Sequence, residues 1–398
     1  MAHGARVVNV RNRVRVAGME VDIMSTPRLN YSPRMTNRLV ETGVFETEHF
    51  FLVDVGASGG IESHWRIFGE YLNAVGFDPL VKECARLNQA ERSPNVRYHA
   101  AYVGAGESAS FLPSEENADP DSGWSNQPFP RTSATRAEQA LSISAMQRYN
   151  SGDEEILLSD ERVSLDEYFS GTRVNTIDFI KIDTDGHDYE VLCGARDILA
   201  KHLVLGLYVE CQFHGQIHPR ANLFSNIDRL LREEGFSLFD IEVYRYTRAC
   251  LPGKFVYDIP AQTTGGQVLW GDALYLRDAA VPGYEDRWEC ELSVEKLIKL
   301  ACLFEIYGLP DCEAELLLAH KGRLGDVIDV PGCLDLLAAE ADPSSPSFED
   351  HNRKFDEEPE SFFPGEQEPW KEKLRTAEIG SGLFRLKKIL GSLRTGPK

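Results

Sequence analysis

The sequence predicts a doubly wound, Rossmann-like α/β fold, with a seven-stranded, mostly parallel sheet that ends in an antiparallel hairpin. From residue 50 to 278, apolar runs of four to eight residues alternate with amphipathic stretches, which is the pattern of strands joined by covering helices. The last two runs, 236–244 and 267–277, have no helix-period segment between them. We therefore expect these two to pair as a hairpin instead of forming another crossover.

Three strands are expected in the first half of this region. FFLVDVG at 50–56 precedes a helical stripe, NAVGFDP at 73–79 leads to a helix at 80–90, and NVRYHAAYVG covers 95–104. The stripe has apolar residues at helical spacing, namely Ile61, Trp65, Phe68 and Leu72. The segment 112–150 does not continue this alternation of apolar runs and amphipathic stretches. Its aromatic and basic residues suit a mobile lid: Trp124, Phe129, Arg131 and Arg136. A surface insertion is an equal alternative.

Two further strands with their helices are expected in the second half. IDFIKID at 177–183 and LVLGLYVEC at 203–211 are each followed by apolar residues at helical spacing. The first helix carries Tyr189, Leu192, Ala195 and Leu199, and the second carries Phe224, Ile227, Leu230 and Leu231. With the terminal hairpin, these segments complete seven strands.

Segments outside 50–278 are expected to be separate parts of the chain. Residues 1–49 form an N-terminal arm, either a short hairpin or irregular, and 279–340 form a small helical appendage rich in leucine and alanine. Residues 341–398 are expected to be an acidic, flexible linker that ends in a basic amphipathic stretch. That stretch is most simply a solvated helix. Contact with an anionic membrane surface or with an acidic partner is the alternative.

Composition excludes several classes of protein. The net charge of −21 disfavours general nucleic-acid binding, because phosphate backbones are held by clustered Lys and Arg. No apolar stretch is long enough for a transmembrane helix, and the N-terminus lacks the apolar core of a secretory signal, so we expect a cytoplasmic protein. The eight cysteines form no CxxC pair, which favours reduced thiols over disulfides or structural zinc.

A glycine-rich turn follows the first strand. It has the form Asp54-x-Gly56-x-x-x-Gly60, with Ala57 and Ser58 between the glycines. Glycines let the backbone bend tightly and approach a ligand, and Asp54 is placed to receive the ammonium side of that ligand. A turn that merely closes a βα unit explains this motif alone equally well.

A second motif ends the second strand at Asp78 and Pro79. One carboxylate can accept hydrogen bonds from both vicinal hydroxyls of a ribose, and Asp78 follows Gly56 by 22 residues. This spacing also fits a nicotinamide dehydrogenase. The missing G-x-G-x-x-G turn and the terminal hairpin both disfavour that class. An ordinary strand-end aspartate that makes a turn is as good an explanation of Asp78 alone.

The most specific motif is DFIKIDTDGHDYEVLCGA at 178–195. It places Asp183, Asp185 and His187 just past the carboxyl end of a strand, where open α/β sheets bind ligands. The run resembles the signature of the FkbM family of S-adenosylmethionine-dependent methyltransferases: a strand ending in Lys-x-Asp, an acidic residue and glycine, and a helix beginning near Glu-x-Val-Leu. VDVGASGG, GFDP, VSLDEYF and GDALYLR resemble that family in the same order over about 50–278. Asp185 and His187 depart from its pattern.

This resemblance implies a class I methyltransferase fold and S-adenosylmethionine as cofactor. It implies donor binding by Asp54, Gly56, Ala57, Ser58, Gly60, Asp78, Pro79 and Asp183. The expected reaction is O-methylation of a hydroxyl on a carbohydrate or natural-product acceptor. Two alternatives stay open: N-methylation of a small molecule, and a catalytically silent module that binds S-adenosylmethionine and recruits partners.

Catalytic candidates lie beside the expected donor site. His187 is the first candidate for the base that removes a hydroxyl proton, with Asp183 or Asp185 to orient it, because an imidazole titrates near neutral pH. The alternative is a set of residues that only caps a helix. Glu210 and His214 follow the next strand and are expected at the same edge. Carboxylates at Asp183, Asp185 and Glu210 are weak candidate ligands for Mg²⁺.

Overall fold

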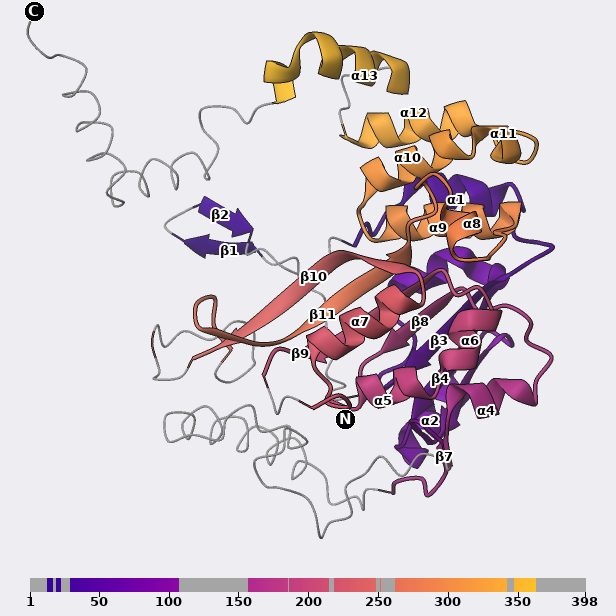
Figure 1. Ribbon diagram of the computed structural model, residues 1–398, viewed down its shortest axis with the longest axis vertical. Coiled ribbons are helices and arrows are strands. Elements are labelled where there is room, and N and C mark those ends of the chain that lie inside the picture. Colours follow the sequence, from indigo (N-terminus) through magenta and orange to yellow (C-terminus); the bar gives the residue numbers. More distant parts are fainter. Residues whose placement is uncertain are drawn as a thin grey trace, which may run out of the picture. The chain divides into compact units, whose positions relative to one another are not determined.

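A seven-stranded sheet forms the centre of the computed structural model (Figure 1), in the order β10-β11-β9-β8-β3-β4-β5. The structure describes residues 13–16, 19–22, 29–106, 157–184, 186–214, 218–247, 251, 262–341 and 347–362. The strands are β3 (Phe50–Val55), β4 (Leu72–Asp78), β5 (Val96–Ala100), β8 (Phe179–Ile182), β9 (Gly206–Gln212), β10 (Phe236–Tyr246) and β11 (Gln267–Arg277). Strands β3, β4, β5, β8 and β9 are parallel, whereas β11 is antiparallel to both β9 and β10. The predicted fold, including its terminal hairpin, is confirmed.

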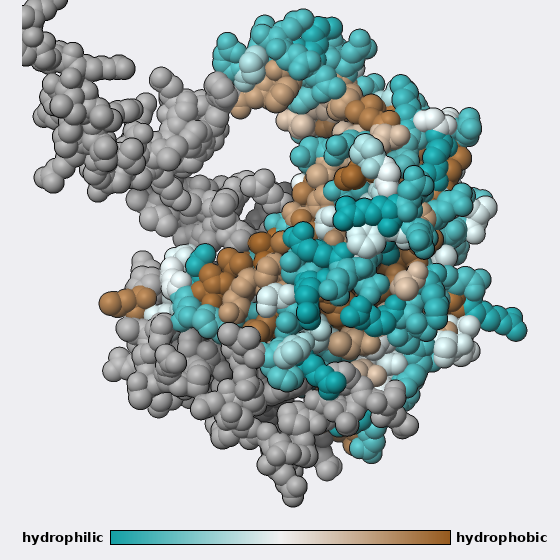
Figure 2. Space-filling model, viewed as in Figure 1, coloured by the Kyte–Doolittle hydropathy of each residue, from teal (hydrophilic) through white to brown (hydrophobic). Residues whose placement is uncertain are grey.

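Four helices pack against one face of the sheet: α4 (Leu165–Ser170), α5 (Asp188–Cys193), α6 (Arg196–Lys201) and α7 (Phe224–Glu233). Their apolar side chains form one core with strand residues such as Val53, Ile180 and Val209, all fully buried. The outward-facing surfaces of these helices that are visible in Figure 2 are mainly hydrophilic. This is expected for helices that bury one apolar stripe against a sheet.

The other face is covered by aromatic side chains from η1 (Ser63–Tyr71) and from the end of α9 (Val294–Ile306). The rings of Phe50 and Phe68 stack with centroids 4.3 Å apart, and those of Phe179 and Tyr307 with centroids 5.5 Å apart. Trp65 lies between them, 4.9 Å from the Phe179 ring. Part of the predicted C-terminal appendage therefore covers the sheet itself.

Two elements of the first half differ from the prediction. The stripe after the first strand was expected to be a helix that reached Leu72. The structure has a 3-10 helix there instead, interrupted at Gly69 (φ 56°), and Leu72 already begins β4. The expected strand at 95–104 is divided into β5 and β6 (Tyr102–Val103), and β6 pairs with β7 (Arg162–Val163) outside the main sheet. The spacing of apolar residues alone does not distinguish a 3-10 helix from an α-helix, or one long strand from two short ones.

The remaining helices and the N-terminal hairpin lie outside the seven-stranded sheet. They are the hairpin β1 (Arg13–Val16) and β2 (Met19–Asp22), then α1 (Arg34–Glu41), α2 (Val81–Ala90), α8 (Tyr284–Arg287), α10 (Pro310–Ala319), α11 (Lys321–Leu324), α12 (Val330–Ala341), α13 (Phe348–Glu357) and η3 (Pro359–Phe362). The chain forms two compact units, 1–330 and 331–398. Helices α8 to α11 belong to the same unit as the sheet, and the domain boundaries expected at 279 and 341 stay predictions. No helix in the described part of the chain is long and apolar enough to cross a bilayer.

A buried ion-pair cluster joins α9 to the sheet. The Asp178 carboxylate, just before β8, lies 2.8 Å from Nζ of Lys296 and 3.0 Å from Nζ of Lys299. It also accepts a 2.7 Å hydrogen bond from the Phe51 N–H. All three charged side chains are almost completely excluded from solvent. Buried charges are tolerated only when they are paired, so this cluster fixes α9 against β3 and β8.

Candidate functional site

The glycine turn after β3 brings three strand ends together. Gly56 has a φ of +87°, and a Cβ built on it would lie 1.8 Å from the carbonyl oxygen of Asp183. The N–H groups of Gly56 and Ala57 both donate to the carbonyl of Phe77, at 2.9 Å. Only glycine fits at position 56, because both the backbone conformation and the close approach of β8 exclude a side chain.

The rest of this turn is open to solvent. Gly60 also has a positive φ, of +91°, and its N–H donates to the Ala57 carbonyl at 2.9 Å. Ala57 is buried, whereas Ser58 and Gly59 are exposed. At the exposed part of the turn, the Gly59 N–H donates to the Glu83 carboxylate at 3.1 Å.

Asp78, at the end of β4, is buried and tied to the backbone around it. Its Oδ1 accepts a 2.8 Å hydrogen bond from the N–H of Leu80, the residue after Pro79. Burial raises the pKa of Asp78, while hydrogen bonds from the Leu80 and Ser58 N–H groups oppose that rise. The Asp78 carboxylate thus makes a local turn and also holds the glycine turn beside it.

Lys181 stands between two carboxylates of this edge. Its Nζ is 3.4 Å from Oδ1 of Asp54 and 3.3 Å from Oδ2 of Asp183. Asp54 is 2% exposed, and its Oδ1 has no other partner among the described residues. Burial raises the pKa of Asp54, and Lys181 counteracts part of that rise. Burial acts to lower the pKa of Lys181, but the Asp54 and Asp183 carboxylates outweigh it and raise the pKa.

Asp188 shapes the loop between β8 and α5. Its Oδ1 accepts from the N–H and the hydroxyl of Thr184, at 2.9 and 3.0 Å, and its Oδ2 accepts from the Asn222 amide at 2.8 Å. Asn222 in turn accepts from the Tyr189 N–H. Burial raises the pKa of Asp188 to about 6. These contacts give Asp188 a structural role in the loop that carries Asp183 and His187.

His187 lies on the exposed side of this loop. Its Nδ1 is 3.5 Å from Oε2 of Glu190, one turn along α5, while the Asp183 carboxylate pairs with Lys181. The contacts that the structure describes therefore orient His187 through Glu190, which the sequence did not suggest. Asp185 lies outside the described residues.

Glu210 and His214 reach the same edge from β9. Because Ile182 pairs with Val209, the next residues, Asp183 and Glu210, follow on neighbouring strand ends. Nε2 of His214 is 2.7 Å from the Gln267 amide nitrogen, which holds the ring beside β11. Within the described residues, no three His, Cys, Asp or Glu side chains form a metal-binding group. Asp185, a member of the suggested Mg²⁺ set, is outside that part of the chain.

Several residues of this edge were not predicted as site residues. Lys181 belongs to the Lys-x-Asp strand ending, but only the register of β3 with β8 places it opposite Asp54. His64 begins η1; burial, with a smaller contribution from Lys181, lowers its pKa to about 4, and its Nε2 has no partner among the described residues. Tyr307 reaches the same face from the end of α9. No local sequence signal identifies these two residues.

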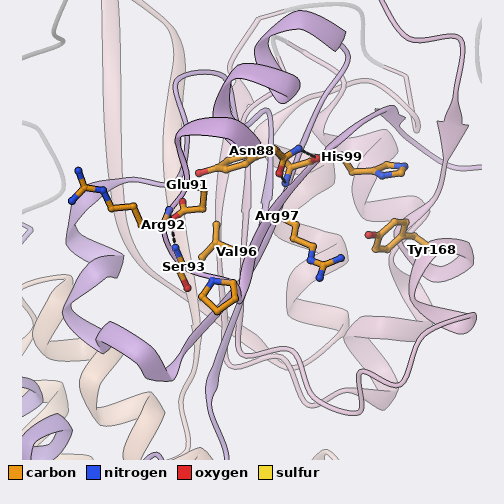
Figure 3. A pocket seen from close by; sticks show the side chains of 10 residues that line it. Asn88, Glu91, Arg92, Ser93, Val96, Arg97, His99 and Tyr168 are labelled. Carbon is orange, nitrogen blue, oxygen red and sulfur yellow. Dashed lines mark hydrogen bonds between the residues drawn. The ribbon is translucent and has the colours of Figure 1, made fainter.

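A separate hollow lies at the far edge of the sheet, beside β5 (Figure 3). It has a volume of about 680 Å³, and Arg92, Arg97, His99 and Tyr168 are among its lining residues. The Asn88 side chain spans the free edge there, because its amide bonds both the N–H and the carbonyl of Tyr98. This hollow belongs to a different part of the sheet from the glycine turn.

Residues 54–238 match the family model of the methyltransferase FkbM domain. The protein is a methyltransferase of the S-adenosylmethionine-dependent class. More specifically, residues 54–238 form a methyltransferase domain of the FkbM type. No curated protein matches its sequence.

Solved methyltransferase structures are similar to the chain at low identity. Magnesium protoporphyrin IX methyltransferase from Synechocystis PCC 6803, with bound S-adenosylmethionine, has 10% identity and a TM-score of 0.25, over 62% of this chain and 80% of that one. A methyltransferase from Aquifex aeolicus has 10% identity and a TM-score of 0.24, over 64% of this chain and 100% of that one. An arsenic(III) methyltransferase from Chlamydomonas reinhardtii has 11% identity and a TM-score of 0.28, over 61% and 73%. Substrates and residue roles do not transfer at this level of similarity.

Proposed function

We propose that this methyltransferase transfers the methyl group of S-adenosylmethionine to a hydroxyl oxygen of a carbohydrate or natural-product acceptor. The observation that carries the proposal is the convergence of the glycine turn, Asp78 and the Asp54–Lys181–Asp183 cluster at one carboxyl edge. Open α/β sheets bind their ligands at this edge.

The donor site would be formed by Asp54, Gly56, Ala57, Ser58, Gly60, Asp78, Pro79 and Asp183. One feature fits a bound donor: the buried Oδ1 of Asp54 has only a long ion pair to Lys181 among the described residues. Asp54 would receive an ammonium group, and Asp78 a pair of ribose hydroxyls. When bound, S-adenosylmethionine supplies an electrophilic methyl group on its sulfonium.

The protein must also remove the proton of the attacking hydroxyl. We assign this role to His187, which lies in the loop after β8. Nδ1 of its exposed ring is 3.5 Å from the Glu190 carboxylate in α5. Asp183, Asp185, Glu210 and His214 would position the acceptor around it. If Mg²⁺ takes part, Asp183, Asp185 and Glu210 are the side chains to hold it, and the ion would acidify the hydroxyl in place of the imidazole.

The test compares His187→Ala with His218→Ala, an exposed histidine of the β9–α7 loop. His187→Ala should lower turnover roughly 10²-fold while the affinity for S-adenosylhomocysteine stays the same, because a base acts on the acceptor. His218→Ala should leave both unchanged. Equal turnover in the two variants would remove His187 from the mechanism.

Metal and acceptor chemistry are separated by two further measurements. If EDTA, Asp183→Asn or Glu210→Gln abolishes turnover while His187→Ala does not, a metal-activated hydroxyl replaces the histidine. Product analysis then distinguishes a new O-methyl ether from an N-methyl group. Donor binding without transfer to any acceptor would favour the silent binding module.

A further inference from the structure

The polar edge continues beyond the donor residues, across β9, β11 and β10. In the sheet register Glu210 pairs with Asp272, Asp272 with Glu242, and Trp270 with Tyr244. Paired residues of neighbouring strands project from the same face of a sheet. These five residues therefore form two adjacent rows on the face that carries Lys181.

Glu242 is a buried carboxyl with unmet hydrogen-bonding capacity. The residue is 4% exposed, and neither Oε atom has a hydrogen-bond partner by geometry among the described residues. The Tyr244 hydroxyl is close, but it donates its single proton to Oδ2 of Asp272, at 3.1 Å. Burying a polar group without partners is costly, and a ligand that hydrogen-bonds to Glu242 would remove that cost.

An aromatic platform lies directly beside the carboxyl row. The rings of Tyr244 and Trp270 stack with centroids 3.9 Å apart and an interplanar angle of 23°. The indole N–H donates to the Tyr246 hydroxyl at 3.2 Å, which fixes the plane of the ring. Both rings are only half-buried. Partly exposed aromatic rings next to hydrogen-bonding carboxyls match a ligand ring that has C–H groups on its face and hydroxyls on its rim.

The charge of this surface restricts what it can bind. Burial raises the pKa of Glu242 to about 8, with Asp272 as a second cause, and raises that of Asp272 to about 7, with Asp183 as a second cause. Near neutral pH the Glu242 carboxyl is largely protonated, so it can both donate and accept hydrogen bonds, as a hydroxyl does. An anionic ligand would lie in a row of acidic side chains.

We propose that Glu242, Asp272, Tyr244 and Trp270 form the acceptor subsite, and that it takes an uncharged, polyhydroxylated ring. The inference rests on the proposed methyl-transfer function and adds the location and the charge class of the acceptor. Asp272 connects the two sites, since it pairs with Glu210, which follows Asp183 on the neighbouring strand.

The experiment uses the full chain saturated with S-adenosylhomocysteine, whose own binding is first measured by calorimetry. Saturation-transfer NMR and calorimetry then measure binding of methyl pyranosides of glucose, galactose, mannose and fucose. Glucuronate and glucosamine serve as matched anionic and cationic probes. At least one neutral sugar should bind. Glucuronate should bind roughly 10-fold more weakly than it does, and glucosamine no more tightly than it does, because a protonated Glu242 offers no counter-charge.

The variants test the named residues. Glu242→Leu and Trp270→Ala should weaken sugar binding roughly 10-fold or more, and Glu242→Gln, which keeps hydrogen-bonding groups, should weaken it less. Affinity for S-adenosylhomocysteine should stay unchanged in each variant, which also reports that the fold is intact. Asp197→Asn, on the outer surface of α6, is the control that should change neither affinity.

Three results would overturn the subsite: no neutral sugar binds, a charged probe binds best, or the Glu242→Leu and Trp270→Ala variants bind sugar like the parent. Failure of the parent protein to bind S-adenosylhomocysteine is a different result. It would overturn the proposed function from which the subsite was inferred.

Discussion

Gly56 shows how a single residue determines the geometry of the proposed donor site. Its missing side chain lets the Asp183 carbonyl approach the turn, and this contact brings β3 and β8 together at the carboxyl edge. Lys181 then balances the buried charge of Asp54 at the same point. The absence of a Cβ at Gly56 and the ammonium group of Lys181 together let the ends of β3 and β8 lie close to each other.

Gly56→Val should weaken binding of S-adenosylhomocysteine by at least about 10-fold, because the new side chain must displace the Asp183 backbone and is strained at positive φ. Calorimetry measures the affinity, and circular dichroism checks the fold. Gly171→Val is the control, since a Cβ there meets nothing within 4 Å. Unchanged affinity in Gly56→Val would place the donor elsewhere.

Glu242 should make stability depend on pH. Its pKa is raised to about 8 in the folded protein, so ionisation is more costly there than in the unfolded chain. The penalty is absent below a pH of about 4, grows as pH rises, and is complete above about 8. Glu242→Gln should therefore melt several degrees higher than the parent at pH 9 and nearly equally at pH 4.5. A difference that is constant with pH would contradict the buried, unpaired carboxyl.

Among the elements, α9 has the largest influence outside the region that matches the family. Its two lysines pair with Asp178 at the start of β8, and Tyr307 at its end stacks on Phe179. The helix thus holds both the base of the sheet and its aromatic face. Residues after the matched region therefore help to cover this face of the sheet.

Asp178→Ala should destabilise the protein by about 3–5 kcal/mol, because it leaves the ammonium groups of Lys296 and Lys299 buried without their shared carboxylate. Urea denaturation measures the free energy of unfolding. Asp197→Asn, which breaks the exposed pair with Lys201, should cost at most about 0.5 kcal/mol. Similar values for the two variants would mean that the cluster does not anchor α9.

At the scale of the whole molecule, the sheet extends past the matched region. The family match ends at residue 238, within β10, yet β11 lies between β9 and β10 and completes the sheet. The donor residues come from the first half of the sheet and the proposed acceptor residues from its last hairpin. Binding of donor and acceptor is therefore expected to depend on different strands of one continuous structure.

S-adenosylhomocysteine should raise the melting temperature, whereas NAD should not. A ligand bound only by the folded protein stabilises it by about 2.7 kcal/mol at 100 times its Kd, which corresponds to several degrees. Differential scanning fluorimetry measures the shift, and Asp78→Ala should reduce it by removing the ribose contact. A shift with NAD alone would show that the donor assignment is wrong.

The sequence by itself determined the strands, the terminal hairpin, the glycine turn and the family. Period-two and helical apolar spacing are local properties, and the turn residues are defined by their own backbone requirements. Asp54, Asp78, Asp183 and Glu210 could be assigned to the carboxyl edge because the ends of parallel strands meet there.

Tertiary structure alone decided which side chains meet. Strand register brought Lys181 to Asp54 and Glu242 to Asp272, and packing placed Tyr307 on the sheet. The 3-10 form of η1 also depended on packing. Most such contacts join residues that are far apart in the chain. Lys299 and Asp178, for example, are 121 positions apart. A local sequence pattern contains no information on such pairs, because the energy that selects them arises only when the whole sheet is assembled.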